Sequence, residues 1–259
     1  MSAPGLGTGG CLAGRTRPPG VSRVPPAVGV LADRLAGLGW VTGLLAAGSL
    51  ATGDYVPGVS DLDLVALTEG PVGRPRQEVL TGLHRDLDHG AARGLNLGCM
   101  YVDAGRLADA AALHPVWTHG MLVHRSLSGV TRAELVRHGF AVLGRPPSAV
   151  LPDMTDDDVR QAARAELCGY WAWATRRPLM WLNPVIADLG LTSMARGRHA
   201  LATGQLLTKT QAIEQAHAPA WLRAQLRARR RGERVASPRT RTALIAWRDA
   251  RRTVARAGC

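Results

Sequence analysis

The sequence of 259 residues is poor in several features that would point to particular protein classes. Its four cysteines, Cys11, Cys99, Cys168 and Cys259, include no CxxC pair, which argues against a structural zinc site and against a disulfide framework. We therefore expect reduced thiols and a cytoplasmic protein. No apolar run reaches the length of about 20 residues that a membrane-spanning helix needs, so no membrane partner is expected.

Lysine is almost absent, because Lys209 is the only one in a chain with 32 basic and 20 acidic residues. The formal net charge of +12 is therefore due to arginine, which is concentrated at residues 223–234 and 239–256. In a chain also rich in Ala, Gly and Leu, solvated arginine-rich helix faces explain this excess better than a nucleic-acid surface does. A nucleic-acid partner is thus disfavoured, although it stays as an alternative.

Composition otherwise indicates an ordinary globular protein, with 46% hydrophobic and 20% charged residues. The length suggests one large domain or two modest ones. Residues 1–25 are rich in Gly and Pro and lack the continuous apolar core of a secretory signal, so we predict a disordered N-terminus.

Chemistry is concentrated in residues 48–67, GSLATGDYVPGVSDLDLVAL. Gly48 and Ser49 end one apolar run, and Asp61 and Asp63 begin the next. Alternate residues of a strand share a face, so the two aspartates are expected to project together. Neighbouring carboxylates repel each other, and Mg²⁺ bound through carboxylates and substrate phosphates would relieve this repulsion. Gly48 and Ser49 would let a phosphate approach the backbone at a helix start.

The order of these residues resembles the signature of the polymerase-β-like nucleotidyltransferase superfamily. The matching positions are Gly48-Ser49, Gly53, Pro57 and Ser60-Asp61-Leu62-Asp63-Leu64. The resemblance implies that Asp61 and Asp63 are catalytic Mg²⁺ ligands, and that Gly48, Ser49 and Ser60 help to bind ATP. A DxD pair alone is common, and the alternative is a turn with two surface aspartates.

The expected fold class is α+β, with a mixed-sheet nucleotidyltransferase domain at 26–150 and an all-α helical bundle at 151–259. In the first domain we predict strands at 41–47, 62–67, 95–102, 122–125 and 140–143, helices at 25–39, 77–88, 106–114 and 131–139, and a loop at 114–120. In the second we predict helices at 155–176, 183–204, 208–217, 220–232 and 238–257. Their expected N-caps include Thr155, Thr208 and Ser237.

Residues 191–215 resemble the helical domain of the streptomycin/spectinomycin 3''-adenylyltransferases. The resemblance rests on Arg196, Thr203-Gly204 and Thr208-Lys209. It implies that Arg196 and Lys209 reach across an interdomain cleft to the phosphates of ATP, where cations would stabilise the leaving pyrophosphate. The alternative is that Lys209 only occupies a helix start, where a cation is mildly unfavourable.

The sequence departs from this family at the general base. Where the family carries a glutamate on the third strand, this chain has Asn96, which cannot accept a proton at neutral pH. Asp103 at the end of the same strand is one candidate for a catalytic role, and His119 and His124 are others. The substrate's own amine or a metal-bound hydroxide could also serve.

The predicted reaction is Mg²⁺-dependent transfer of AMP from ATP to a hydroxyl of a small molecule, with an aminoglycoside as the acceptor that the family suggests. The residues nearest to such an acceptor would be Glu166, Trp171, Trp173, Trp181 and Asp188. The mostly basic helical domain argues against a polycationic acceptor. Two rival functions are a nucleotide-binding module that has lost catalysis through Asn96, and a protein- or nucleic-acid-directed nucleotidyltransferase.

Overall fold

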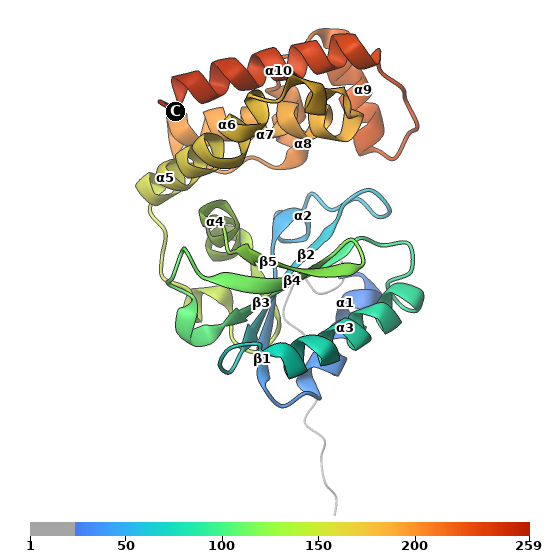
Figure 1. Ribbon diagram of the computed structural model, residues 1–259, viewed down its shortest axis with the longest axis vertical. Helices are drawn as coiled ribbons and strands as arrows, with labels where there is room; N and C mark the ends of the chain where they lie inside the picture. The colour runs from blue at the N-terminus through green and yellow to red at the C-terminus, as the bar shows by residue number, and fades with distance from the viewer. Residues whose placement is uncertain (1–23) are drawn as a thin grey trace, which may run out of the picture.

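The computed structural model describes residues 24–259, which form an α/β domain followed by a helical domain (Figure 1). The chain passes from one domain to the other between η3 (Pro147–Ala149) and α5 (Asp156–Glu166). The predicted disordered N-terminus lies almost wholly outside the described residues.

A six-stranded mixed sheet forms the centre of the N-terminal domain, in the order β5-β4-β3-β2-β1-β6. Only β2 and β3 pair in parallel, with Leu62 opposite Leu97 and Asp63 opposite Gly98. The other pairs are antiparallel. The strands are β1 (Val41–Ala46), β2 (Leu62–Thr68), β3 (Leu97–Asp103), β4 (Leu113–Thr118), β5 (Met121–Ser126) and β6 (Phe140–Leu143).

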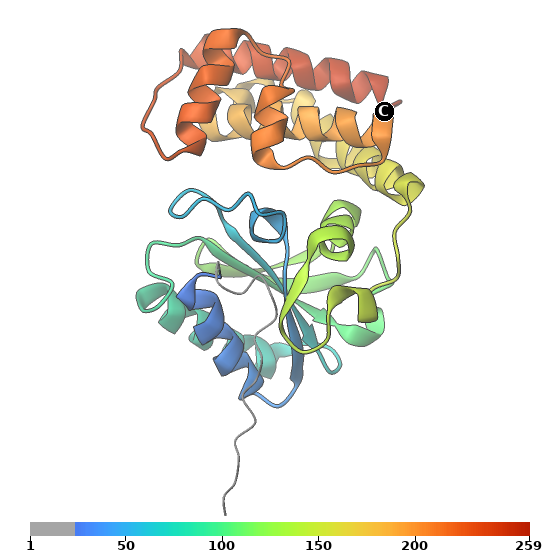
Figure 2. The same cartoon turned by 180° about the vertical axis from the view of Figure 1, so that it is seen from behind.

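Both faces of this sheet are covered, so its central strands are almost continuously apolar. One face packs against α1 (Pro26–Ala36) and α3 (Arg74–His89), as the core formed with Leu31 and Leu80 shows. The other packs against α4 (Gly129–His138), through Leu135. The short helix α2 (Gly48–Ala51) lies next to α4 and faces the helical domain (Figures 1 and 2).

The helical domain packs around a core that contains Trp171, Trp181 and Leu191. Its elements are α5, the π-helical turn η4 (Leu167–Trp171), α6 (Ala172–Thr175), the 3₁₀ turn η5 (Pro178–Leu182), α7 (Pro184–Thr203), α8 (Lys209–Glu214), α9 (Ala220–Arg230) and α10 (Arg239–Arg256). The helix predicted at 155–176 is thus present but interrupted by a π turn. None of the helices described from residue 24 onward is both long and apolar enough to cross a membrane.

Helix ends follow the predicted capping chemistry in two of three cases. Thr155 and Thr208 each form a capping box with the residue three positions later. Ser237 was wrongly predicted as an N-cap, because α10 begins one residue later with Pro238 at that position. The Ser237 hydroxyl instead accepts a hydrogen bond from Arg229 at 2.9 Å.

The prediction for residues 106–120 was wrong. The predicted helix is absent: a 3₁₀ turn, η2 (Ala104–Arg106), is followed by irregular turns, and most of the expected loop is strand β4. The reason is tertiary: β4 is buried between β3 and β5, whose ladders outweigh the weak strand preference of a segment that contains Pro115. The hairpin turn after β4 has positive φ at His119 (50°) and Gly120 (75°), as a type I′ turn requires.

The expectation of reduced thiols is also wrong for one pair, because Cys168 and Cys259 form a disulfide across 91 positions of sequence. Helix α10 packs along η4 and brings the C-terminal residue to the π turn. Cys99 stays a free, buried thiol. Spacing could not reveal a bridge between distant segments, and the cytoplasmic prediction loses the support that it drew from the scattered thiols.

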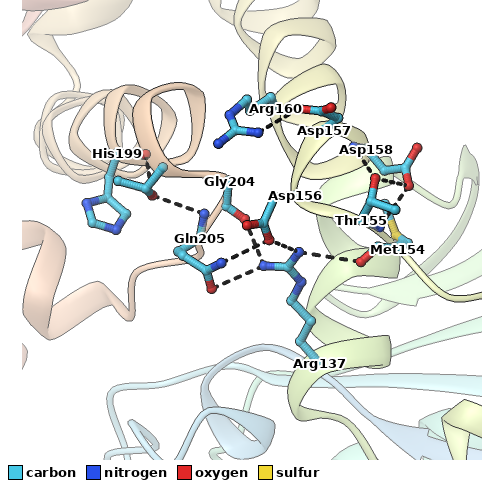
Figure 3. A network of polar contacts seen from close by, with 11 residues as sticks. Arg137, Met154, Thr155, Asp156, Asp157, Asp158, Arg160, His199, Gly204 and Gln205 are labelled. Carbon is cyan, nitrogen blue, oxygen red and sulfur yellow. Dashed lines mark hydrogen bonds and ion pairs between the residues drawn. The ribbon is translucent and has the colours of Figure 1, made fainter.

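Besides the ion pair of Glu134 with Arg196, two groups of polar contacts join the domains. In the first, which we call the Arg137 cluster, Arg137 of α4 contacts Asp156 at 2.7 Å, the carbonyl oxygen of Gly204 at 2.7 Å and the side chain of Gln205 at 3.2 Å (Figure 3). Gln205 in turn donates to Asp156 at 2.9 Å. Every partner comes from the helical domain, so this cluster fixes α4 against the start of α5 and the end of α7.

The second group, which we call the Asp54 cluster, lies on the loop between α2 and β2. The carboxylate of Asp54 accepts hydrogen bonds from the backbone N–H of Thr210 at 3.0 Å and from its hydroxyl at 2.5 Å. It also pairs with Arg230 at 3.1 Å. Both side chains of this ion pair are largely buried, at 14% and 9% exposure. The cluster therefore connects the N-terminal domain to α8 and α9.

Candidate active site

The site begins where β2 meets α2. The backbone N–H of Ala47 donates to the carbonyl oxygen of Asp63 at 2.9 Å, which holds the start of α2 beside the strand. Gly48 has φ 57°, and a Cβ at this position would lie 2.2 Å from Oδ2 of Asp63. Only glycine therefore fits, for its conformation and for the space that the carboxylate occupies. The first N–H groups of a helix lack intrahelical partners, so α2 presents donors next to Asp63.

The electrostatic environment of Asp63 disfavours its negative charge. Its side chain keeps contact with solvent, but the protein around it reduces hydration, and this raises the pKa of the carboxyl group. The charge of Lys209 lowers that pKa, those of Asp61 and Glu134 raise it, and that of Arg196 lowers it. The net direction is upward, because the reduced hydration of the carboxylate has the largest effect.

Asn96 lies directly beside Asp61. Its backbone oxygen accepts from the N–H of Leu62 at 2.8 Å, which places Asn96 at the start of the parallel β2–β3 pair. Its side-chain amide donates to Oδ1 of Asp61 at 2.7 Å. The side chain of Asn96 is therefore a hydrogen-bond donor that orients Asp61.

The structure does not bring Asp103 into the site. Asp103 is opposite Thr68, whereas Asp63 is opposite Gly98, so Asp103 lies five positions further along the strands, or about 17 Å. Its carboxylate caps η2 by accepting from the N–H of Gly105 at 3.0 Å. Strands β2 and β3 are parallel, so Asp61, Asp63 and Asn96 lie at the start of this pair and Asp103 lies at its far end. The prediction that Asp103 is catalytic is therefore wrong.

The two histidines differ in position. Strand β4 runs antiparallel to β3, with Trp117 opposite Cys99. The turn at His119, which follows β4, therefore lies beside the start of β3, near Asn96. His124 is opposite Pro115, in the middle of β5, and lies 3.4 Å from Gln77. Of these two candidates, only His119 lies at the end of the sheet that carries the aspartates.

An interdomain cavity of about 60 Å³ joins the two halves of the predicted site. From the N-terminal domain it is lined by Gly48, Ser49, Thr52, Asp63 and Glu134, and from the helical domain by Arg196, Leu207, Thr208 and Lys209. Ser49 and Arg196 belong to different motifs, 147 positions apart in the chain, and both were predicted to bind phosphate. They thus line one cavity.

Arg196 and Lys209 reach this cavity from different elements. Arg196 lies in the middle of α7, where its Nε donates to the carbonyl oxygen of Leu207 at 2.9 Å and its Nη2 pairs with Glu134. Lys209 is the first residue of α8, directly after the Thr208 cap. Lys209 lines the cavity, and its positive charge lowers the pKa of Asp63.

Ser60 does not line this cavity. It is buried, and its hydroxyl accepts from the backbone N–H of Val56 at 3.0 Å and from Arg230 at 2.8 Å. The predicted role of Ser60 in nucleotide binding therefore has no geometric support. Its contacts support the loop that leads to Asp61 and its attachment to α9.

Sequence reasoning missed Glu134 and the Asp54 cluster. Glu134 follows Ala133 and precedes Leu135, and all three are buried, because α4 contacts the sheet on one side and the helical domain on another. An amphipathic pattern reports only one buried face, so it gave no signal for a buried acid.

The donor set at Asp61 and Asp63 fits Mg²⁺. Within residues 24–259 no three His, Cys, Asp or Glu side chains form a metal-binding group. Mg²⁺ commonly binds through one or two carboxylates together with substrate phosphates and water. The aspartates, the raised pKa of Asp63 and the open cavity beside it match that mode of binding.

A second cavity lies on the other side of Arg196 and includes Glu166 and Trp171. Burial raises the pKa of Glu166, while Arg196 and Trp171 lower it and Glu134 raises it. The remaining acceptor candidates lie elsewhere: Trp181 is buried in the helical core, Trp173 is partly exposed and carries Arg177 over its ring at 4.0 Å, and Asp188 is paired with Arg229 at 2.6 Å.

Comparison with protein-family models gives no match, and comparison with curated protein sequences gives none either. Among solved structures, the chain is similar to the crystal structure of spectinomycin adenyltransferase AAD(9) from Enterococcus faecialis with ATP and spectinomycin. The similarity has a TM-score of 0.65 and 17% sequence identity, and it covers 88% of this chain and 97% of that one. The chain thus has an aminoglycoside nucleotidyltransferase-like fold, which confirms the α+β fold predicted from the sequence.

Proposed function

We propose that the protein is a nucleotidyltransferase that moves AMP from ATP to a hydroxyl of a small molecule and releases pyrophosphate. The observation that carries this proposal is the interdomain cavity, which places Gly48, Ser49 and Asp63 opposite Arg196 and Lys209. Similarity to an adenyltransferase solved with ATP supports the same reaction class.

In this proposal the charge of each group determines what it binds. Gly48 and Ser49 offer backbone donors to the β- and γ-phosphates, while Arg196 and Lys209 stabilise the charge that develops on the leaving pyrophosphate. Asp61, oriented by Asn96, and Asp63 would hold Mg²⁺. That ion would supply charge neutralisation at the phosphates between which the bond breaks.

The attacking hydroxyl must lose a proton, and Asn96 cannot accept it. We assign this role to His119, which follows β4 at the same end of the sheet. An imidazole can accept a proton at neutral pH. The assignment is tested by comparing His119→Gln with His124→Gln, because only the first is expected to lower the rate.

The acceptor binds, in this proposal, beside Glu166 and Trp171, in the cavity that shares Arg196 with the phosphate site. That cavity contains one acidic side chain and an aromatic wall. An acceptor with one or few positive charges fits it better than a polycation does. An aminoglycoside or spectinomycin stays the first acceptor to try, because the structural neighbour was solved with spectinomycin. Antibiotic resistance would then be the biological role.

The experiment is pyrophosphate release from ATP and Mg²⁺, with and without a panel of aminoglycosides and spectinomycin. The Asp61→Asn/Asp63→Asn double variant is the blank. Asp103→Asn is the matched control, since it makes the same chemical change about 17 Å away. Acceptor-dependent release that the double variant loses and Asp103→Asn keeps would support the proposal. Equal release by the double variant and the wild type would refute it.

A second function has its own supporting observation. Asn96 donates to Asp61 instead of providing a base, as would suit a module that binds nucleotide without transferring it. Binding of ATP with Mg²⁺ that the double variant loses, without pyrophosphate release for any acceptor, would favour this module.

A further inference from the structure

Glu134 is an acidic residue at a position where the proposed function needs positive charge. It lies on α4 with only 8% of its surface exposed, and it lines the interdomain cavity with Asp63 and Arg196. A carboxylate here repels a triphosphate and raises the pKa of Asp63, so its presence needs a reason. The reason lies in what it contacts.

The guanidinium group of Arg196 is held at two of its three nitrogens. Nε donates to the carbonyl oxygen of Leu207 at 2.9 Å, and Nη2 donates to Oε1 of Glu134. Because guanidinium is planar, two fixed donors define the plane of the whole group. Within residues 24–259, Nη1 makes no hydrogen bond, and Arg196 lines the cavity. The remaining donors are thus held ready for a ligand.

We propose that Glu134 is a positioning residue that orients Arg196 toward the β- and γ-phosphates of ATP. This inference rests on the proposed function, since it assumes that ATP occupies the cavity. Glu134 acts through Arg196 and does not itself touch the nucleotide. The cost in repulsion is offset because Arg196 enters the site in the orientation that a phosphate requires, without first losing side-chain freedom.

A simpler role would be domain bridging, because Glu134 belongs to one domain and Arg196 to the other. The structure provides a control for that role. Arg137 lies on the same helix three residues later and also bridges the domains, through Asp156, Gly204 and Gln205, but it does not line the cavity. A bridging effect would appear in both positions, and a positioning effect only at Glu134.

The test is isothermal titration of the full chain with ATP and Mg²⁺, and separately with AMP, which lacks the β- and γ-phosphates. Glu134→Met fills a similar volume but accepts no hydrogen bond, whereas Glu134→Gln keeps an acceptor oxygen. We expect Glu134→Met to weaken ATP binding about tenfold, as loss of an orienting partner commonly does. We expect AMP binding to stay unchanged and Glu134→Gln to bind ATP at least as tightly as the wild type.

Two further variants complete the design. Arg137→Met is expected to lower thermal stability and to leave the affinity for ATP unchanged. In an Arg196→Lys background, Glu134→Met is expected to add little, because its effect passes through the guanidinium. Circular dichroism establishes that each variant is folded.

Three results would overturn the inference: unchanged or tighter ATP binding by Glu134→Met, an equal loss for AMP, or an equal loss in Arg137→Met. If the proposed function itself were wrong, the wild type would not bind ATP, and this result is distinct from the other three.

Discussion

The two domains meet in two chemically different ways. At the Arg137 and Asp54 clusters, each charged group is matched by partners from the other domain. In the interdomain cavity, positive and negative groups face one another with donors left over, and the carboxyl of Asp63 has a raised pKa. Ion pairs between the domains hold the structure together, whereas charges around a cavity with unused donors indicate a place for a charged ligand.

This comparison predicts separate consequences for the two kinds of contact. Changes in the cavity should reduce activity, and removal of the Asp63 charge should also spare stability, because the surroundings of Asp63 disfavour that charge. Changes in the clusters should reduce stability. We order the predictions that test this distinction by the size of the effect that we expect.

Asp63→Asn should lower adenylyl transfer by about a thousandfold, because the charge that holds the cation is lost. The thermal midpoint should not fall, since a carboxylate with reduced hydration and acidic neighbours is removed. Pyrophosphate release and thermal unfolding on the same sample measure both effects. A variant that retains activity, or one that unfolds, would place Asp63 among the structural contacts.

The disulfide should stabilise the helical domain without affecting the cavity. Closing a loop of 91 positions corresponds to about 4.6 kcal/mol in the chain-entropy model. Cys168→Ser and Cys259→Ser should each reduce the free energy of unfolding by a similar amount, and a reducing agent should reproduce the loss in the wild type only. Cys99→Ser serves as the control that leaves the bridge intact. A thiol count of four without reductant would contradict the bridge.

Arg230→Met should destabilise the protein by about 3 kcal/mol, because it leaves the largely buried carboxylate of Asp54 without its ion-pair partner. Urea unfolding measures the loss. Arg231→Met, next in the chain but paired with Glu233 on the exposed surface, is the matched control with little expected change. Loss of ATP affinity in folded Arg230→Met would show that this cluster also shapes the site.

Lys209→Met should raise the KM for ATP about tenfold, since one cation of the phosphate site is removed. The unfolding free energy should change little, because the first turn of a helix does not favour a cation. Steady-state kinetics with varied ATP separates KM from kcat. An unchanged KM would show that Lys209 only occupies the helix start.

The smallest effect that we expect is a loss of stability at low pH, through protonation of Asp54. Burial opposes ionisation of Asp54, but the hydrogen bonds from Thr210 and the charge of Arg230 outweigh it, so its pKa is lowered from the ordinary value of 3.8. A lowered pKa contributes stability that is fully present above the ordinary value and is lost as the pH falls through the folded value. Stability should therefore decline below pH 3.8. The decline should be smaller in Asp54→Asn than in Asp33→Asn, an exposed control on α1. Equal slopes in urea titrations at several pH values would refute this.

Much of the fold could be predicted because its signals are local. The helices that begin at Thr155 and Thr208 follow from their capping boxes, and α7 ends at Gly204 in the left-handed conformation. Strand β4 could not be predicted, because the pairing that makes it a strand comes from β3 and β5 rather than from its own residues.

For the site, the sequence alone determined which chemical groups are available. Gly48 and Ser49 open α2, and Asp61 and Asp63 stand two positions apart at the start of β2, so local backbone geometry settles the arrangement within each pair. The pairing of β1 with β2 then brings the two pairs together. The placement of Lys209 at a helix start is local in the same way.

Only the tertiary structure decided how these groups are used. The parallel register of β2 and β3 excluded Asp103 and placed Asn96 against Asp61. Helix α5 packs against both α4 and α7, and Glu134 of α4 pairs with Arg196 of α7. The packing of α10 against η4 joined two distant cysteines. Register and helix packing depend on contacts between residues far apart in the chain, and no local pattern of residues encodes them.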